Sequence, residues 1–168
     1  MLRRIGVGGA GLWLSLLFLA GPAHAATGTQ RFTIVFTGNP RAGVLGRVVA
    51  TGPVTGVGTD ATIAQDPHPD GSETDTDLLT FPGGTITIRD TDPADAFHFN
   101  ERTCTATIST TAGTYTIVGG TGAYAGATGS GTFSAKGIVL FDRVPGGCSE
   151  EPRLFFAVVQ LAGPISVP

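Results

Sequence analysis

Lysine is almost absent from this 168-residue sequence, and basic residues as a whole are few. Lys136 is the single lysine, and 10 basic residues stand against 13 acidic ones. The only adjacent basic pair, Arg3-Arg4, lies near the N-terminus. A nucleic-acid-binding protein needs clustered cations that neutralise phosphates, and an anionic membrane surface attracts the same kind of cluster. The composition therefore excludes nucleic acid as a partner and disfavours a membrane surface.

Long hydrophobic runs are also absent, except for one at residues 5–19. This run follows Arg3-Arg4, is broken by Pro22, and precedes the small-residue pattern Ala23-His24-Ala25, as in a cleaved signal peptide. A membrane anchor is the alternative, but it needs about 20 apolar residues, and this run is shorter and diluted by glycine. We therefore predict a signal peptide at 1–25, and a mature chain at 26–168 that is secreted to the extracellular space or cell envelope and does not insert into the membrane.

Cysteine occurs only twice, as Cys104 and Cys148. In an exported chain, an even number of thiols normally closes into disulfides. Metal ligation is the alternative, but zinc would need two further ligands, and His68 and His98 lie in unrelated sequence contexts. The sequence predicts a Cys104–Cys148 disulfide, no metal site and no cofactor.

Helical periodicity is missing from the mature chain, which alternates apolar and polar residues instead. In the segment 31–37, for example, Phe32, Ile34 and Phe36 share one face, and the other face includes Thr33 and Thr37. The turn sequence Pro82-Gly83-Gly84 favours a tight hairpin, and we expect further short connections at 111–113 and 145–147. Strands are expected near 30–37, 44–51, 54–64, 75–81, 85–91, 96–100, 103–111, 113–118, 129–141 and 153–162, with some of them merging.

Short strands joined by hairpins form an antiparallel meander, and a chain of this length must hide its sheet edges in a barrel or a sandwich. We expect an all-β fold with one domain at 26–168, a single antiparallel β-barrel of about eight strands.

A glycine-rich segment at 117–131 follows a strand and matches the G-x-G-x-x-A pattern of dinucleotide-binding loops. That function requires a helix directly after the loop, whereas the residues from Gly126 onward alternate as in a strand and are rich in glycine. We interpret the segment as a structural turn with Tyr124 packed inward. The residues assigned to this turn are Gly119, Gly120, Gly122, Tyr124 and Gly126.

The segment 117–129, IVGGTGAYAGATG, resembles the IVGGTG-x-aromatic-x-x-A-x-G hallmark of the dirigent and allene oxide cyclase barrel superfamily. The stretch from Val48 to Pro164 is similar to the exported bacterial branch of that superfamily. The resemblance implies an eight-stranded barrel with an internal cavity, often trimeric, and members that steer cyclisation or radical coupling of apolar small molecules. The catalytic carboxylates and arginines of the plant members match no positions in this sequence, so the resemblance does not carry an activity.

Candidate cavity residues are polar side chains that share a strand face with apolar ones. By this criterion we select Glu101, Tyr115 and Gln160, although the favoured interpretation of Glu101 is a position past the strand end, at the barrel rim. The acidic stretch 66–77 partly matches a calcium-binding loop, with Asp66, Asp70 and Asp77 at ligand positions and Gly71 in register. It lacks flanking helices and the terminal glutamate, and a solvated acidic loop is the favoured interpretation.

The segment 153–161 is apolar on both faces, unlike the strands before it. Alternation places Leu154, Phe156, Val158 and Gln160 inside and leaves Phe155, Ala157, Val159 and Leu161 outside, where a neighbouring subunit or another segment of the chain would cover them. A homotrimer is one expectation. For function we expect a non-catalytic barrel that binds an apolar small molecule or a surface partner, with a dirigent- or cyclase-like protein as the alternative.

Overall fold

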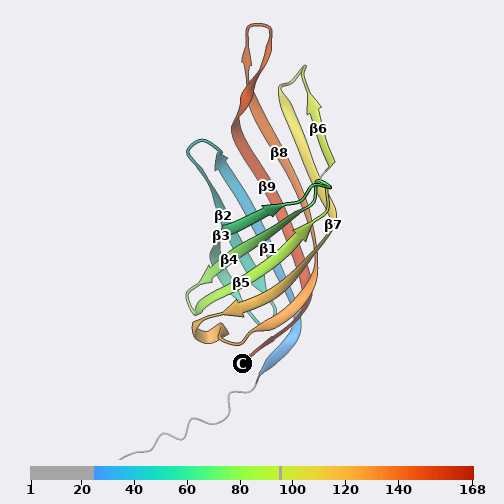
Figure 1. Ribbon diagram of the computed structural model, residues 1–168. Coiled ribbons are helices and arrows are strands. Elements are labelled where there is room, and N and C mark those ends of the chain that lie inside the picture. The colour runs from blue at the N-terminus through green and yellow to red at the C-terminus, as the bar shows by residue number, and fades with distance from the viewer. Residues whose placement is uncertain (1–24, 95) are drawn as a thin grey trace, which may run out of the picture.

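The computed structural model describes residues 25–94 and 96–168, which form nine β-strands, one 3₁₀ turn and no α-helix (Figure 1). The predicted signal peptide at 1–25 therefore lies, except for Ala25, outside the described residues. The elements are β1 (Ala26–Asn39), β2 (Gly43–Thr51), β3 (Gly56–Pro67), β4 (Glu73–Phe81), β5 (Gly84–Asp92), β6 (Ala96–Asn100), β7 (Thr105–Gly120), η1 (Gly122–Tyr124), β8 (Thr128–Val144) and β9 (Gly147–Val167).

Eight of the strands close into an antiparallel barrel. The sheet runs in the order β5-β4-β3-β2-β1-β9-β8-β7-β6, and a further pairing of β5 with β7 joins its ends. Strand β6 lies outside the barrel, where it pairs with residues 105–109 of β7. The predicted all-β fold, a single antiparallel eight-stranded barrel with short hairpins, is confirmed, with β6 as one additional strand.

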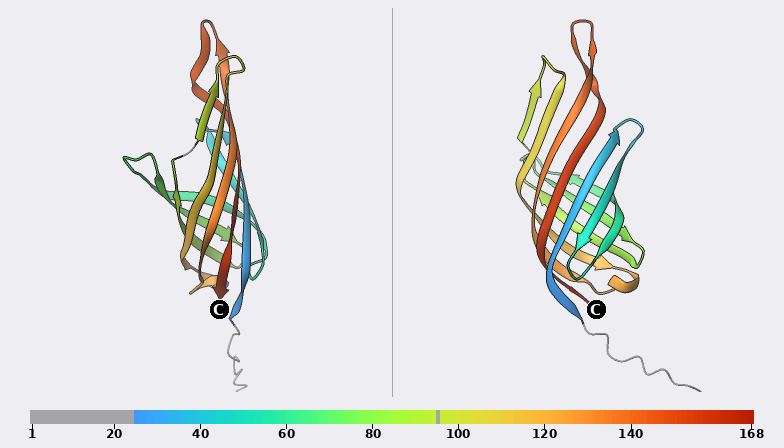
Figure 2. Two further views of the ribbon diagram at one scale, coloured as in Figure 1. Left: turned by 90° about the vertical axis from the view of Figure 1, so that its right-hand side faces the viewer. Right: turned by 180° about the vertical axis from the view of Figure 1, so that it is seen from behind.

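Two hairpins project beyond one end of the barrel (Figure 2). One consists of β6 and the start of β7, and the other of the end of β8 and the start of β9. The Cys104–Cys148 disulfide joins them, with Cα atoms 5.4 Å apart, so the predicted disulfide is confirmed. Arg143 adds hydrogen bonds from its guanidinium to the backbone carbonyls of Glu101 and Arg102. The two hairpins are thus cross-linked outside the barrel.

The opposite end of the barrel is filled by a hydrophobic core that includes Phe32, Phe81, Ile117 and Ile165. Gln30 is fully buried at this end, where its side-chain amide bonds both the N–H and the carbonyl of Val54 in the β2–β3 connection. These bonds satisfy backbone groups that would otherwise be buried without partners.

The glycine-rich segment forms the connection from β7 to β8 at the filled end. Gly122 has a φ of 60°, a conformation that favours glycine, and it begins the short turn η1. Gly119 and Gly120 end β7, and Gly126 lies between η1 and β8 with a φ of 82°. The Tyr124 ring packs against the core in an edge contact with Phe81, at a centroid distance of 5.9 Å.

Two local expectations are wrong. Residues 111–113 are not a connection between strands, because β7 continues through them with a register shift between Thr110 and Gly113, a β-bulge. The inward and outward faces of the last strand are also exchanged. Ala157 and Leu161 are buried inside the barrel, whereas Leu154 and Phe156 are about 40% exposed, at 39% and 42%.

The reason for the second error is that a uniformly apolar strand does not show which face is buried. Pairing fixes the register of β9, since Val35 opposes Val158 and Ile34 opposes Val159.

Among the described residues, no helix combines the length and hydropathy that a membrane crossing requires.

Candidate functional site

A cavity of about 730 Å³ occupies the end of the barrel that the core leaves open. Its volume is in the range of small-molecule binding sites. One wall is apolar and is formed by β1, β8 and β9, with contributions from Ile34, Phe36, Phe133, Ala135, Phe155, Ala157, Val159 and Leu161. Leu79 and Ile88 also line the cavity and belong to the hydrophobic core, so they connect the cavity to the filled half.

The other wall is acidic and comes from three consecutive strands. Asp60 lies on β3, Asp75 and Asp77 lie on β4, and Asp90 and Asp92 lie on β5, and all five line the cavity. Alternation explains their common orientation. Asp75 and Asp77 share the face of buried Leu79 and Phe81, while Asp90 and Asp92 share the face of buried Ile86 and Ile88. We refer to these five residues as the acidic wall.

Burial makes the carboxylate form of the acidic wall costly. Burial raises the pKa of Asp60 to about 7, with a second contribution from the charge of Asp77 and a smaller opposing effect from the backbone N–H of Ala61. Burial, followed by the charges of the neighbouring aspartates, raises the pKa of Asp90 to about 8. The pKa of Asp75 rises to about 6 through burial and the charges of Glu73 and Asp77.

Asp77 on β4 adjoins Asp90 on β5 at the acidic wall. Burial raises the pKa of Asp77, whereas Thr62 and Asp90 act in the opposite direction. With its pKa raised to about 8, Asp90 favours the protonated form at neutral pH. The acidic wall therefore presents both proton donors and acceptors to the cavity.

The three cavity candidates from the sequence are not brought together. Tyr115 is buried, with 2% of its surface exposed, and packs in the hydrophobic core, where burial raises the pKa of its phenol. Gln160 is exposed on the outer face of β9, so its expected position in the cavity is wrong. Glu101 is exposed in the turn directly after β6, which agrees with the favoured position past the strand end, and it does not line the cavity.

The acidic wall is what sequence reasoning missed. The stretch 66–77 is a solvated loop only in part: residues 66–71 are exposed, as expected, whereas β4 begins at Glu73 and turns Asp75 and Asp77 into the barrel. These residues could have been found by following the alternation of each strand beyond its last apolar residue, so that the aspartates at the same parity are also assigned to the inner face. On β5 the same reasoning would have continued Ile86 and Ile88 to Asp90 and Asp92.

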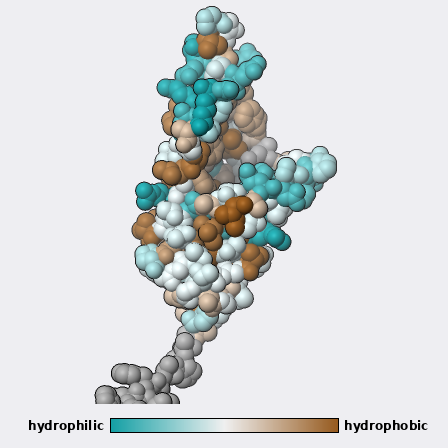
Figure 3. Space-filling model, turned by 60° about the vertical axis from the view of Figure 1, so that its left-hand side comes forward, coloured by the Kyte–Doolittle hydropathy of each residue, from teal (hydrophilic) through white to brown (hydrophobic). Residues whose placement is uncertain are grey.

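The face drawn in Figure 3 carries both hydrophilic and hydrophobic groups of residues. Hydrophilic residues gather on the projecting hairpins, whereas hydrophobic residues form separate patches along the side of the barrel (Figure 3). The exposed hydrophobic side chains include Val49, Val57, Ile63, Ile138 and Phe156. The homotrimer stays a prediction.

No protein-family model, curated protein or solved structure matches this chain. The resemblance to the dirigent and allene oxide cyclase superfamily therefore stays a prediction based on the segment 117–129. The cavity and its two walls are the features from which a function can be inferred.

Proposed function

We propose that this protein is an exported, non-catalytic binding protein that holds an apolar small molecule in its barrel. The observation that carries the proposal is the cavity of about 730 Å³ with an apolar wall facing an acidic wall. An apolar molecule buries its hydrophobic part against β1, β8 and β9, and a hydrogen-bonding group at its other end meets the carboxyl groups of β3 to β5. Apolar lining with a few convergent polar groups is typical of small-molecule sites.

A pair of related fluorescent probes tests the proposal. N-phenyl-1-naphthylamine is neutral and apolar, and 8-anilinonaphthalene-1-sulfonate adds a sulfonate to the same skeleton. We expect saturable binding of the neutral probe with one site per chain and weaker binding of the sulfonate, because the acidic wall repels an anion. Absence of saturable binding of the neutral probe would contradict the proposal.

Matched variants locate the probe. Ala135 lines the cavity, and its neighbour Ser134 lies on the outer face of the same strand. Ala135→Phe should fill part of the cavity and lower the affinity for the neutral probe at least tenfold, whereas Ser134→Phe should leave this affinity unchanged. Equal affinities in the two variants would place the probe outside the barrel.

Asp60 favours a second candidate, a cyclase- or dirigent-like activity. Its side chain is only 6% exposed and lines the cavity, and neither carboxyl oxygen has a hydrogen-bond partner of standard geometry among the described residues. A carboxylic acid in this position can lend a proton to a bound molecule and take it back, so that an isomer of the same mass forms.

The test of this second candidate uses a compound that copurifies with the protein. Incubation with fresh protein should convert it into an isomer with a different chromatographic retention, and Asp60→Asn should bind it without conversion. An unchanged compound leaves binding as the function and contradicts the catalytic candidate.

A further inference from the structure

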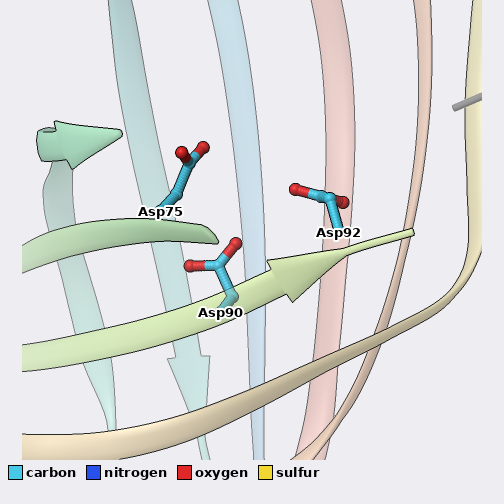
Figure 4. Close-up of side chains that lie close together, drawn as sticks. All are labelled: Asp75, Asp90 and Asp92. Atoms are coloured by element: carbon cyan, nitrogen blue, oxygen red, sulfur yellow. The ribbon is translucent and has the colours of Figure 1, made fainter. Parts of the chain in front are cut away.

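Asp75, Asp90 and Asp92 form a compact group of carboxylates at the acidic wall. Asp75 and Asp90 are cross-strand partners on β4 and β5, and Asp92 follows two residues later on the same face of β5. One oxygen from each residue lies within 4.8 Å of those of the other two. Figure 4 shows the three side chains grouped around a common space. We refer to them as the aspartate triad.

Burial distinguishes the triad from a solvated acidic patch. Asp90 is only 9% exposed, and its Oδ1 atom has no hydrogen-bond partner among the described residues. The Oδ1 atom of Asp75 is also buried without a hydrogen-bond partner among the described residues. Asp60, on the same cavity wall, is 6% exposed with both oxygens unpartnered in the described part of the chain. A buried carboxyl group without a hydrogen-bond partner costs free energy of folding. Several such groups directed at one space indicate a bound ligand that coordinates to oxygen atoms.

Asp75 and Asp90 form no ion pair with a lysine or arginine in the described ranges. The ion pairs there include Arg41–Glu151 and Arg153–Asp142, both exposed. The charges that act on Asp90 come from other aspartates and work against ionisation. Arg47 and Lys136 line the same cavity, but neither pairs with Asp75 or Asp90, so these two carboxyl groups concentrate negative charge without a direct counter-charge.

We propose that the aspartate triad binds a divalent cation, and that this cation is Ca²⁺. The three ligands are all carboxylate oxygens, with no imidazole or thiolate, which suits a hard cation. Ca²⁺–oxygen bonds of about 2.3–2.6 Å allow two oxygens of one coordination shell to lie up to about 5 Å apart. The triad oxygens, within 4.8 Å of one another, already satisfy this limit. Water in the cavity completes the shell. This site does not depend on the small molecule proposed above.

The proposed site differs from the calcium loop that the sequence suggested. In that pattern Asp66, Asp70 and Asp77 were the ligands, but Asp66 is exposed at the end of β3, and Asp70 Oδ1 accepts hydrogen bonds from the backbone and hydroxyl of Ser72. Only Asp75, from within the same stretch, belongs to the triad, and its partners come from β5. Strand pairing creates the site.

Calorimetric titration with CaCl₂ tests the site. The chain 26–168, with its disulfide intact, is first dialysed against a chelator and then titrated without any apolar probe at about pH 8.5, where the Asp90 carboxyl ionises. We expect one site per chain with a Kd on the order of 10⁻⁴–10⁻³ M or tighter, as for extracellular calcium modules. Absence of binding at concentrations of about 10⁻² M would overturn the proposal.

Charge-matched variants assign the ligands. Asp92→Asn and Asp75→Asn should each weaken Ca²⁺ binding at least tenfold, whereas Asp66→Asn, which removes the same charge from an exposed position on β3, should leave the Kd within twofold. Circular dichroism checks that each variant is folded. Equal weakening by Asp66→Asn and Asp92→Asn would mean that Ca²⁺ responds to net charge alone and would overturn the site. Because Ca²⁺ is titrated without the probe, its failure leaves the proposed small-molecule function standing.

Discussion

Asp75 on β4 and Asp90 on β5 face each other as cross-strand partners inside the barrel. Like charges in directly opposite positions destabilise a sheet, and burial increases the cost. Asp90 avoids this cost at neutral pH because its pKa is about 8, so that it keeps a proton there. A cation is the other way to relieve the repulsion. The pair therefore links the stability of the barrel to both pH and Ca²⁺.

The stability of the barrel should decrease as pH rises. Asp75, Asp60 and Asp90 have folded-state pKa values of about 6, 7 and 8, above the value of 3.8 for an unfolded aspartate. The folded protein therefore holds protons that the unfolded chain releases above about pH 4, and this stabilisation is complete below that pH and lost as pH rises to about 8. Asp77 and Asp92 complete the acidic wall, and the other charged side chains that face or adjoin it are Arg47, Glu73 and Lys136.

Thermal unfolding after removal of divalent cations measures this dependence. The melting temperature should be several degrees higher at about pH 5 than at about pH 8.5, since roughly 1 kcal/mol corresponds to about 2–4 °C in a domain of this size. A melting temperature that is constant or rises over this range would contradict the predicted protonation of the wall.

Replacement of Asp90 by asparagine should remove much of that pH dependence. The amide side chain introduced by Asp90→Asn cannot ionise, so we expect a higher melting temperature than wild type at about pH 8.5 and little difference at about pH 5. Asp142→Asn is the control, because Asp142 is exposed and pairs with Arg153 outside the barrel. Identical pH profiles for wild type and Asp90→Asn would show that Asp90 does not hold the proton.

Two adjacent glycines at the end of β7 should differ in their tolerance of alanine. A Cβ atom at Gly120 would lie 2.2 Å from the backbone oxygen of Tyr124, whereas one at Gly119 meets nothing within 4 Å. Gly120→Ala should therefore lower the free energy of unfolding by about 1 kcal/mol or more, and Gly119→Ala should change it by less than about 0.5 kcal/mol. Chemical denaturation measures both, and equal effects would mean that the turn is not packed as described.

The disulfide should stabilise the projecting hairpins more than the barrel itself. Cys104 and Cys148 are 44 residues apart in sequence and join two segments outside the closed barrel. Linking them is worth about 4 kcal/mol in the chain-entropy model, so the double variant Cys104→Ser/Cys148→Ser should melt several degrees lower. Hydrogen exchange should accelerate mainly at 96–104 and 143–150. Uniform acceleration in every strand would contradict a local role for the bond.

The fold could be predicted from the sequence because alternation of apolar and polar residues indicates its strands, and glycine and proline indicate its turns. Phe32 and Ile34 are buried as their spacing indicates, and the turn at Pro82-Gly83 joins β4 to β5. The closure of β5 onto β7 follows from the need to hide sheet edges.

The candidate site was less accessible, for two physical reasons. An aspartate is normally exposed, so Asp75 and Asp90 were interpreted as the end of a strand or as a loop, although their parity matches buried neighbours. Strand β9 is apolar on both faces, so only its pairing with β1 shows that Ala157 faces inward and Gln160 outward. Asp75 and Asp92 likewise lie close together only because of the register in which β4 pairs with β5.

The measurement that tests the central claim most directly is native mass spectrometry of the protein purified from its natural source. We predict a small-molecule adduct of one per chain that is released on denaturation, present in Ser134→Phe and lost in Ala135→Phe, whose side chain occupies the cavity. A bare protein mass in the wild type, or an adduct retained equally by both variants, would contradict the claim that the barrel cavity is a binding site.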